Sequence, residues 1–278
     1  MSTATITAQD INKLRQATGA GMMDCRKALT ETGGDFEAAI DWLRKQGQKV
    51  AAKRSDREAK EGVVIAKTTA DNKTGFIVTI SCETDFVSKN ADFVAFAQSI
   101  ADAAVANNVK SAEELNEVTV NGAKVADLIN DKLASIGEKI GVARFERIEA
   151  PYVASYIHGA YRMGVLVGFN KDAGEAGKDV AMQIAAMNPV AVDASSVPAD
   201  VVAREKDIVM EQMRQDPKMA GKPDEMLSKI AEGKLNSFFK ESTLTAQAFV
   251  KDASKSVGDY LKSAGDLQVT EFKRVALG

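Results

Sequence analysis

Apolar residues in positions 1–54 recur at the three- and four-residue spacing of amphipathic helices. Glycine-containing breaks at residues 18–21 and 33–35 divide this stretch into three helical segments. Thr7 and Asp10 fit a variant of the capping box at the start of the first segment. Helices this short are marginal in isolation, so we expect them to pack together as a three-helix domain over residues 1–54.

The hydrophobic spacing changes to that of strands after a charged linker at residues 55–61. Residues 62–66 and 75–80 are rich in β-branched and apolar side chains and flank a turn, which predicts a β-hairpin. Three helical patterns and a returning strand come next, at residues 93–105, 112–115, 125–137 and 143–148. Together these elements predict an α+β subdomain over residues 55–148.

The same arrangement then repeats. Residues 152–158 and 163–169 predict a second hairpin, and a helix carrying Val180, Ile184, Ala185 and Met187 follows it. The run at residues 75–78, Gly-Phe-Ile-Val, aligns with Gly-Val-Leu-Val at residues 164–167. We infer two related α+β subdomains built from hairpin, corner and helix.

The second subdomain is predicted to comprise residues 149–193 and 241–278, with a closing helix at 257–261 and a last strand at 269–275. Residues 194–240 interrupt it with two apolar stripes on either side of a turn at residues 216–223. The stripes consist of Val201, Val202, Ile208, Val209 and Met213, and of Leu227, Ile230, Ala231, Leu235 and Phe238. They predict an antiparallel helical hairpin, a short coiled coil, that folds back on the core, projects from it or self-associates.

A corner between strand and helix, Cys82-Glu83-Thr84-Asp85-Phe86-Val87, lies at the end of the first hairpin. Loop corners on rigid scaffolds are where functional side chains are presented. A large apolar side chain beside a carboxylate there needs either a core or a partner to cover it. Phe86 therefore packs beneath its own helix or is covered by another protein.

The charge balance argues against nucleic acid as the main partner. The chain has 36 basic and 39 acidic residues and a net charge of −3, without the basic excess that counterion release requires. A local basic cluster consists of Lys49, Lys53, Arg54, Arg57 and Lys60, interleaved with Asp56, Glu58 and Glu61. This mixture favours a solvated surface over an RNA site. Since no apolar stretch is long enough to cross a bilayer and the start has no apolar signal region, we expect no membrane contact and a cytoplasmic location.

The residues that support catalysis or cofactor binding are sparse. Cys25 and Cys82 share no metal-ligand spacing, and His158 is the single histidine, so no metal site is predicted. The loop with Gly19 and Gly21 follows a helix, and Asp24 replaces the third glycine of a dinucleotide motif. We therefore expect no cofactor and no direct nucleotide binding.

A small-molecule enzyme that uses Asp85 and His158 is the weakest hypothesis. No nucleophile, acid or base motif of known spacing supports it.

Several motifs resemble those of the elongation factor Ts family. They are Thr18-Gly19-Ala20-Gly21-Met22-Met23-Asp24-Cys25, Thr84-Asp85-Phe86-Val87, Tyr156-Ile157-His158-Gly159, Gly221-Lys222-Pro223 and the run at residues 230–235. The resemblance spans essentially the whole chain. The segment at residues 243–250 departs from the family wording, Ser-Leu-Thr-Gly-Gln-Pro-Phe-Val.

The resemblance implies a ubiquitin-associated-like fold for the three-helix domain and elongation factor Tu as the partner. It places Met22, Met23 and Arg26 at a contact with the nucleotide-binding domain of that partner, and His158 on the partner-facing surface. It also implies that Phe86 inserts near the partner's Mg²⁺ site, and that Thr84, Asp85 and Val87 belong to the same contact.

The implied activity is nucleotide exchange and not bond-making catalysis: Mg²⁺ is displaced and GDP leaves, so that GTP can bind. The leading alternative is an RNA- or ribosome-associated adaptor without exchange activity, which would use residues 49–60 and the three-helix domain. The stoichiometry stays open, because the helical hairpin offers a route to a homodimer or to a two-to-two complex.

Overall fold

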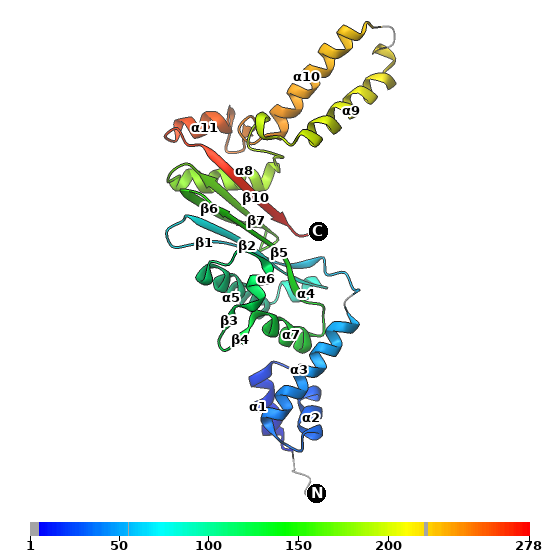
Figure 1. Ribbon diagram of the computed structural model, residues 1–278, viewed down its shortest axis with the longest axis vertical. Coiled ribbons are helices and arrows are strands. Elements are labelled where there is room, and N and C mark those ends of the chain that lie inside the picture. Colours follow the sequence, from blue (N-terminus) through cyan, green and yellow to red (C-terminus); the bar gives the residue numbers. More distant parts are fainter. Residues whose placement is uncertain (1–5, 55, 220–221) are drawn as a thin grey trace.

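The computed structural model describes residues 6–54, 56–219 and 222–278. In Figure 1 three helices form one end of the elongated molecule, two sheets with their covering helices form the middle, and a helical hairpin forms the other end. This confirms the α+β class. Ser55 of the predicted linker, and Ala220 and Gly221 of the predicted hairpin turn, lie outside the described residues. No helix in the described part of the chain is long and apolar enough to cross a bilayer.

The first helices are α1 (Ala8–Thr18), α2 (Met22–Glu31) and α3 (Phe36–Lys53). The capping box is present, because the Thr7 hydroxyl accepts a hydrogen bond from the Asp10 nitrogen and the Asp10 carboxylate accepts one from the Thr7 nitrogen. These helices enclose a core of their own. We call them the three-helix unit. Its buried members are Leu14, Ala20, Cys25, Ala28, Leu29, Ala39 and Leu43.

The first sheet has the order β1-β2-β5, with every neighbouring pair antiparallel. Its strands are β1 (Glu61–Thr68), β2 (Thr74–Cys82) and β5 (Gly141–Glu149). The helices α4 (Asp85–Ser88), α5 (Ala91–Asn107), α6 (Ala112–Glu117) and α7 (Val125–Ile136) lie between β2 and β5 in sequence, along with a small hairpin of β3 (Thr119–Val120) and β4 (Ala123–Lys124). Central strand β2 is buried along its whole length, because α5 covers one face and the second sheet covers the other.

The second sheet repeats this plan in the order β10-β7-β6. Its strands are β6 (Tyr152–His158), β7 (Met163–Phe169) and β10 (Val269–Ala276). The other elements of this part are α8 (Gly174–Met187), η1 (Ala194–Ser196), β8 (Ala248–Phe249), β9 (Asp252–Ser256) and α11 (Val257–Ser263). In both sheets the second strand of a hairpin is central and a later strand adds to it, which confirms the inferred repeat.

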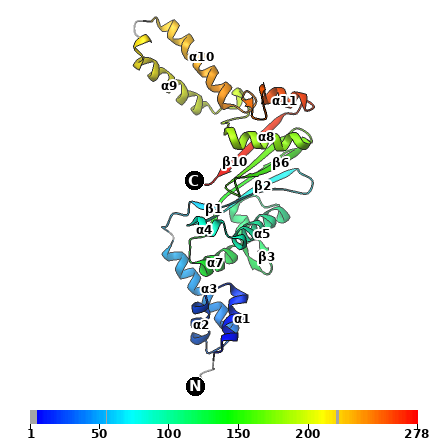
Figure 2. The same cartoon turned by 180° about the vertical axis from the view of Figure 1, so that it is seen from behind.

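The two sheets face each other with helices on the outside, as Figure 2 shows from behind. The aligned glycines lie at this contact in a reciprocal way. A Cβ atom on Gly75 of β2 would lie 2.8 Å from Leu166 Cδ2 of β7, and one on Gly164 of β7 would lie 2.9 Å from Val64 Cγ1 of β1. Each glycine therefore lets the other sheet approach closely.

The hairpin consists of α9 (Ala199–Gln215), η2 (Pro217–Met219) and α10 (Asp224–Ser242), and it projects away from the sheets. Its helices meet at Val209, Met213 and Ala231. Two residues are more exposed than predicted, Ile208 of the first stripe and Met187 of the helix that follows the second β-hairpin. Ile208 is 42% exposed because it precedes Val209 and so points away from α10, and Met187 is 46% exposed because it is the last residue of α8.

Candidate partner-binding surface

The corner that links β2 to the next helices is a short, tightly bonded turn. Strand β2 ends at Cys82, Thr84 has extended backbone angles, and the one-turn helix α4 begins at Asp85. The Asn90 side chain then caps α5 by accepting a hydrogen bond from the Asp92 nitrogen at 2.8 Å. The chain is thus fixed on both sides of Phe86.

Phe86 itself lies outside the core. Its relative exposure is 84%, whereas Val87 packs against the core of the first sheet and Phe93 is buried. The alternative that Phe86 packs beneath its own helix is therefore wrong. The corner therefore holds a phenylalanine ring in water, where a partner could cover it.

Asp85 lies beside this ring and is ion-paired. Its Oδ2 atom is 2.6 Å from Lys89 Nζ, one helical turn along the chain. The hydrogen bond from Lys89, together with its positive charge, holds the pKa of the Asp85 carboxyl below its usual range. Asp85 therefore presents a carboxylate next to the exposed ring.

Two glutamates hold the backbone of the corner. Glu138 Oε2 accepts hydrogen bonds from the backbone nitrogens of Glu83 (3.0 Å) and Thr84 (3.1 Å), and its Oε1 accepts from Thr84 Oγ1 (2.7 Å). Glu83 bonds back to the same segment, because its Oε1 accepts a hydrogen bond from the backbone nitrogen of Lys139 at 2.6 Å. Bonds to ionised carboxylates are stronger than neutral ones, so this part of the corner is rigid.

Glu83 also ties the corner to the end of the three-helix unit. Its carboxylate oxygens lie 2.7 Å from Arg54 Nη1 and 3.1 Å from Arg57 Nη1. The Lys139 N–H, with further bonds from the two arginines, lowers the pKa of Glu83 to about 2. Two arginines of the predicted basic cluster therefore serve an internal contact, and Lys60 pairs with Glu58 at 2.6 Å. The side chain of Lys53 lies outside the described residues.

The turn that follows His158 lies at the same end of the sheets as the corner. The Tyr161 carbonyl accepts a hydrogen bond from the Val64 nitrogen of β1, and Arg162 pairs with Glu61, which is opposite Cys82 in the strand register. His158 is exposed, and its Nδ1 lies 3.0 Å from the Tyr156 hydroxyl. The described residues show no hydrogen bond or ion pair between His158 and Asp85, which weakens the hypothesis of an enzyme built on them.

The predicted contact of the three-helix unit forms a separate surface. Met22 and Met23, at the start of α2, are 53% and 72% exposed, and Arg26 is exposed on the next turn. Cys25 points the other way into the core of the unit. In Figure 1 helix α2 lies at the end of the molecule, so Met22, Met23 and Arg26 do not share one pocket with the Phe86 corner.

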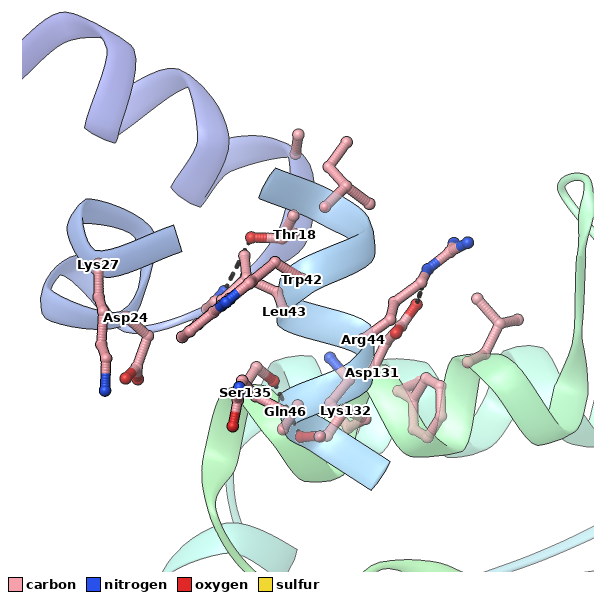
Figure 3. Close-up of a pocket in the computed structure, with 18 residues that line it drawn as sticks. Thr18, Asp24, Lys27, Trp42, Leu43, Arg44, Gln46, Asp131, Lys132 and Ser135 are labelled. Carbon is pink, nitrogen blue, oxygen red and sulfur yellow. Dashed lines mark hydrogen bonds and ion pairs between the residues drawn. The ribbon is translucent and has the colours of Figure 1, made fainter. Parts of the chain in front are cut away.

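A cavity of about 540 Å³ lies elsewhere, at the seam between α3 and α7. Figure 3 shows Trp42, Arg44 and Gln46 from the three-helix unit opposite Asp131, Lys132 and Ser135. Arg44 Nε pairs with Asp131 Oδ2 at 3.6 Å, and Gly47 lets α3 approach α7 so closely that a Cβ there would lie 2.6 Å from Ala134 Cβ. In the described part of the chain no group of three His, Cys, Asp or Glu side chains could hold a metal ion.

The sequence patterns did not point to Glu138, gave Glu83 no role, and placed Arg54 only in the basic cluster. Glu138 is 54 residues from Thr84, so no local motif joins them. One signal was present: Gly137 ends a helical pattern just before a strand predicted to return to the same sheet. Antiparallel pairing of that strand with β2 would place residues 138–140 next to the corner.

Known proteins resemble this chain along nearly its whole length. A family model described as Elongation factor TS matches residues 83–278. A curated elongation factor Ts from Christiangramia forsetii is 49% identical over 279 residues, which cover 99% of this chain and 100% of that protein. The elongation factor Ts of Flavobacterium psychrophilum is 48% identical over 99% of this chain and 100% of its own length. That of Amoebophilus asiaticus is 47% identical over 98% of this chain and 99% of its own length. The family match begins at the corner, and the relatives extend the similarity over the three-helix unit.

Proposed function

The chain belongs to the elongation factor Ts family, and from this premise we propose that it is the guanine-nucleotide exchange factor of elongation factor Tu. It binds the GDP-bound GTPase, displaces Mg²⁺ and disturbs the nucleotide site, so that GDP leaves and GTP binds. The observation that carries this proposal is the exposure of Phe86, 84%, on a corner whose backbone is held by hydrogen bonds.

Exchange of this kind requires binding and no bond-making step. A protein that binds the empty GTPase more tightly than the GDP-bound form weakens GDP binding by the same ratio, because the two equilibria are linked. Mg²⁺ bridges the phosphates to protein oxygens in GTPases, so its displacement removes a large part of the attraction for GDP. An inserted ring can supply the required preference if it fits only the state in which this site is disturbed.

The residues of the corner have different roles in this contact with the partner. Phe86 provides the apolar surface that enters the partner, and Asp85 offers a carboxylate beside it. Val87 anchors α4 in the core, and Thr84 fixes the backbone before the ring through its bonds to Glu138. These roles make the corner a wedge whose base is rigid and whose tip is free.

The three-helix unit supplies a second contact. Met22 and Met23 expose adaptable thioether side chains on one turn of α2, with the guanidinium of Arg26 beside them. We assign this surface to the nucleotide-binding domain of elongation factor Tu. His158 lies at the end of the sheets that carries the wedge, and we assign it to the same partner-facing side.

A direct test uses elongation factor Tu loaded with a fluorescent GDP analogue. Addition of this protein with excess unlabelled GDP should raise the release rate in a saturable way, and an unchanged rate would rule out exchange activity. Binding to RNA with a steep salt dependence would instead support the adaptor, although the pairing of Arg54 and Arg57 with Glu83 reduces the charge available for it. Light scattering of the complex separates one-to-one from two-to-two assembly through the hairpin.

A further inference from the structure

We propose that Glu138 is a positioning residue for exchange, which sets the direction of the Phe86 ring by holding the backbone of residues 83 and 84. This inference rests on the proposed function and adds a residue to it. Glu138 does not reach the tip of the wedge, since its contacts are to Glu83 and Thr84.

Glu138 makes three hydrogen bonds to the corner, all through its carboxylate. One carboxylate accepts both consecutive backbone N–H groups and the Thr84 hydroxyl, so both of its oxygens are used. Such an arrangement fixes the peptide planes on either side of Glu83 and leaves the backbone before α4 one favoured conformation. A neutral amide at position 138 has a single acceptor oxygen and cannot serve all three donors.

The exposed Phe86 ring takes its direction from the backbone that carries it. Phe86 is largely in water, and α4 is a single turn whose N-cap residue, Thr84, makes no side-chain hydrogen bond to the backbone of that turn. Val87 anchors the turn on one side through its contact with the core. The direction in which the ring points therefore depends on the backbone that enters α4 at Thr84, and Glu138 bonds to that residue.

The antiparallel pairing of β2 with β5 brings Glu138 next to the corner. Ser81 of β2 is opposite Gly141 of β5 in the antiparallel register, so the segment before β5 runs alongside the segment after β2. Gly137 ends α7 with a left-handed φ of 78°, which turns the chain into that segment. The Lys139 nitrogen, in the segment before β5, in turn donates a hydrogen bond to the Glu83 carboxylate, in the segment after β2. The two segments are therefore bonded to each other in both directions.

The expected consequence is kinetic. When the corner is loosened, the ring must be ordered during binding, and the conformation that disturbs the nucleotide site is less populated. Glu138→Gln should lower the maximal rate of GDP release at saturating factor about tenfold, which corresponds to about 1.4 kcal/mol. The factor concentration for half-maximal rate should change much less, because the surface of the three-helix unit is untouched.

The experiment measures release of a fluorescent GDP analogue from elongation factor Tu with the full-length protein, Glu138→Gln, Phe86→Ala and the double variant. If Glu138 acts through the ring, the substitution at position 138 changes the rate less than twofold once the ring is gone. Thr84→Val removes one of the three donors with little change of shape and should give a smaller loss in the same direction. Glu114→Gln is the matched control, because Glu114 of α6 accepts a hydrogen bond from the backbone nitrogen of Lys110, away from the corner.

The following results would overturn the positioning role of Glu138. A wild-type rate for Glu138→Gln, or an equal loss with and without Phe86, overturns the positioning role while the exchange function stands. A loss for Glu114→Gln as large as that for Glu138→Gln also overturns it, since it would show a general effect on stability. If the wild-type protein does not accelerate release at all, the proposed function falls and the positioning role falls with it.

Discussion

Truncation of Phe86 to alanine should leave the folded protein nearly unchanged and yet slow nucleotide release. The ring is 84% exposed, so the folded state gains little from it. Substitutions of exposed residues without buried contacts usually change the free energy of unfolding by less than about 0.5 kcal/mol. We expect the urea unfolding curve of Phe86→Ala to overlay that of the wild type within this margin.

The effect on exchange should be much larger, because nearly the full surface of the ring is still available to be covered by a partner. Complete burial of a phenylalanine side chain contributes on the order of 2–3 kcal/mol. If this energy is gained mainly in the state from which GDP leaves, its loss lowers the maximal release rate by roughly 30- to 150-fold. The factor concentration at half-maximal rate should rise less, since Met22 and Met23 remain in place.

Stopped-flow fluorescence measures both quantities. Elongation factor Tu carrying a fluorescent GDP analogue is mixed with excess GDP and increasing amounts of each variant, and the rate is followed to saturation. Val250→Ala is a matched control, because Val250 is also exposed (46%) but lies far along the chain, next to β8. It should exchange at the wild-type rate.

A maximal rate for Phe86→Ala within twofold of the wild type would refute the wedge. So would a large loss of folding stability, because it would mean that the ring belongs to the core and that any loss of exchange reflects unfolding. Phe86→Leu keeps part of the apolar surface, so its maximal release rate should lie between those of the wild type and Phe86→Ala.

Three further predictions concern other parts of the molecule. Met23→Ala removes a side chain that is 72% exposed and should weaken binding to elongation factor Tu by about 1–2 kcal/mol in titration calorimetry, whereas full affinity would exclude the α2 contact. Glu83 has a folded-state pKa of about 2, lowered from 4.5, so its contribution to stability is complete above about pH 4.5 and is lost as the pH falls towards 2. Glu83→Gln should therefore destabilise the protein in urea at pH 7 and hardly at pH 2, and an equal loss at both values would contradict the assignment. Burial, with the negative charges of Glu138 and Glu61, raises the pKa of the Cys82 thiol to about 12. Cys82 should therefore resist thiol-reactive reagents at pH 8 until the protein unfolds. Rapid labelling of Cys82 in the folded protein, measured by mass spectrometry, would disprove this.

Most elements could be predicted from the sequence because their signals are local. The strands at residues 152–158 and 163–169 agree with β6 and β7 residue for residue, and the Thr7 cap was readable from side chains three positions apart. The predictions failed where burial depended on the angle of a helix against its neighbour. Ile208 fits the apolar stripe by spacing, but the contact with α10 passes through Val209 and Met213.

The candidate partner-binding surface could likewise be predicted only in part from the sequence. Periodicity, turn chemistry and family motifs located the corner and selected Phe86, Met22 and Met23, because these signals lie within a few neighbouring residues. Whether Phe86 lies in a core or in water was undecided by sequence, since a single helical turn can direct its side chains to either side. The tertiary structure leaves the ring in water, and the antiparallel pairing of β2 with β5 brings Glu138 to the backbone of Thr84 beside it. Contacts between residues so far apart along the chain exist only after the sheet has formed, and the rigid base of the corner is one of them.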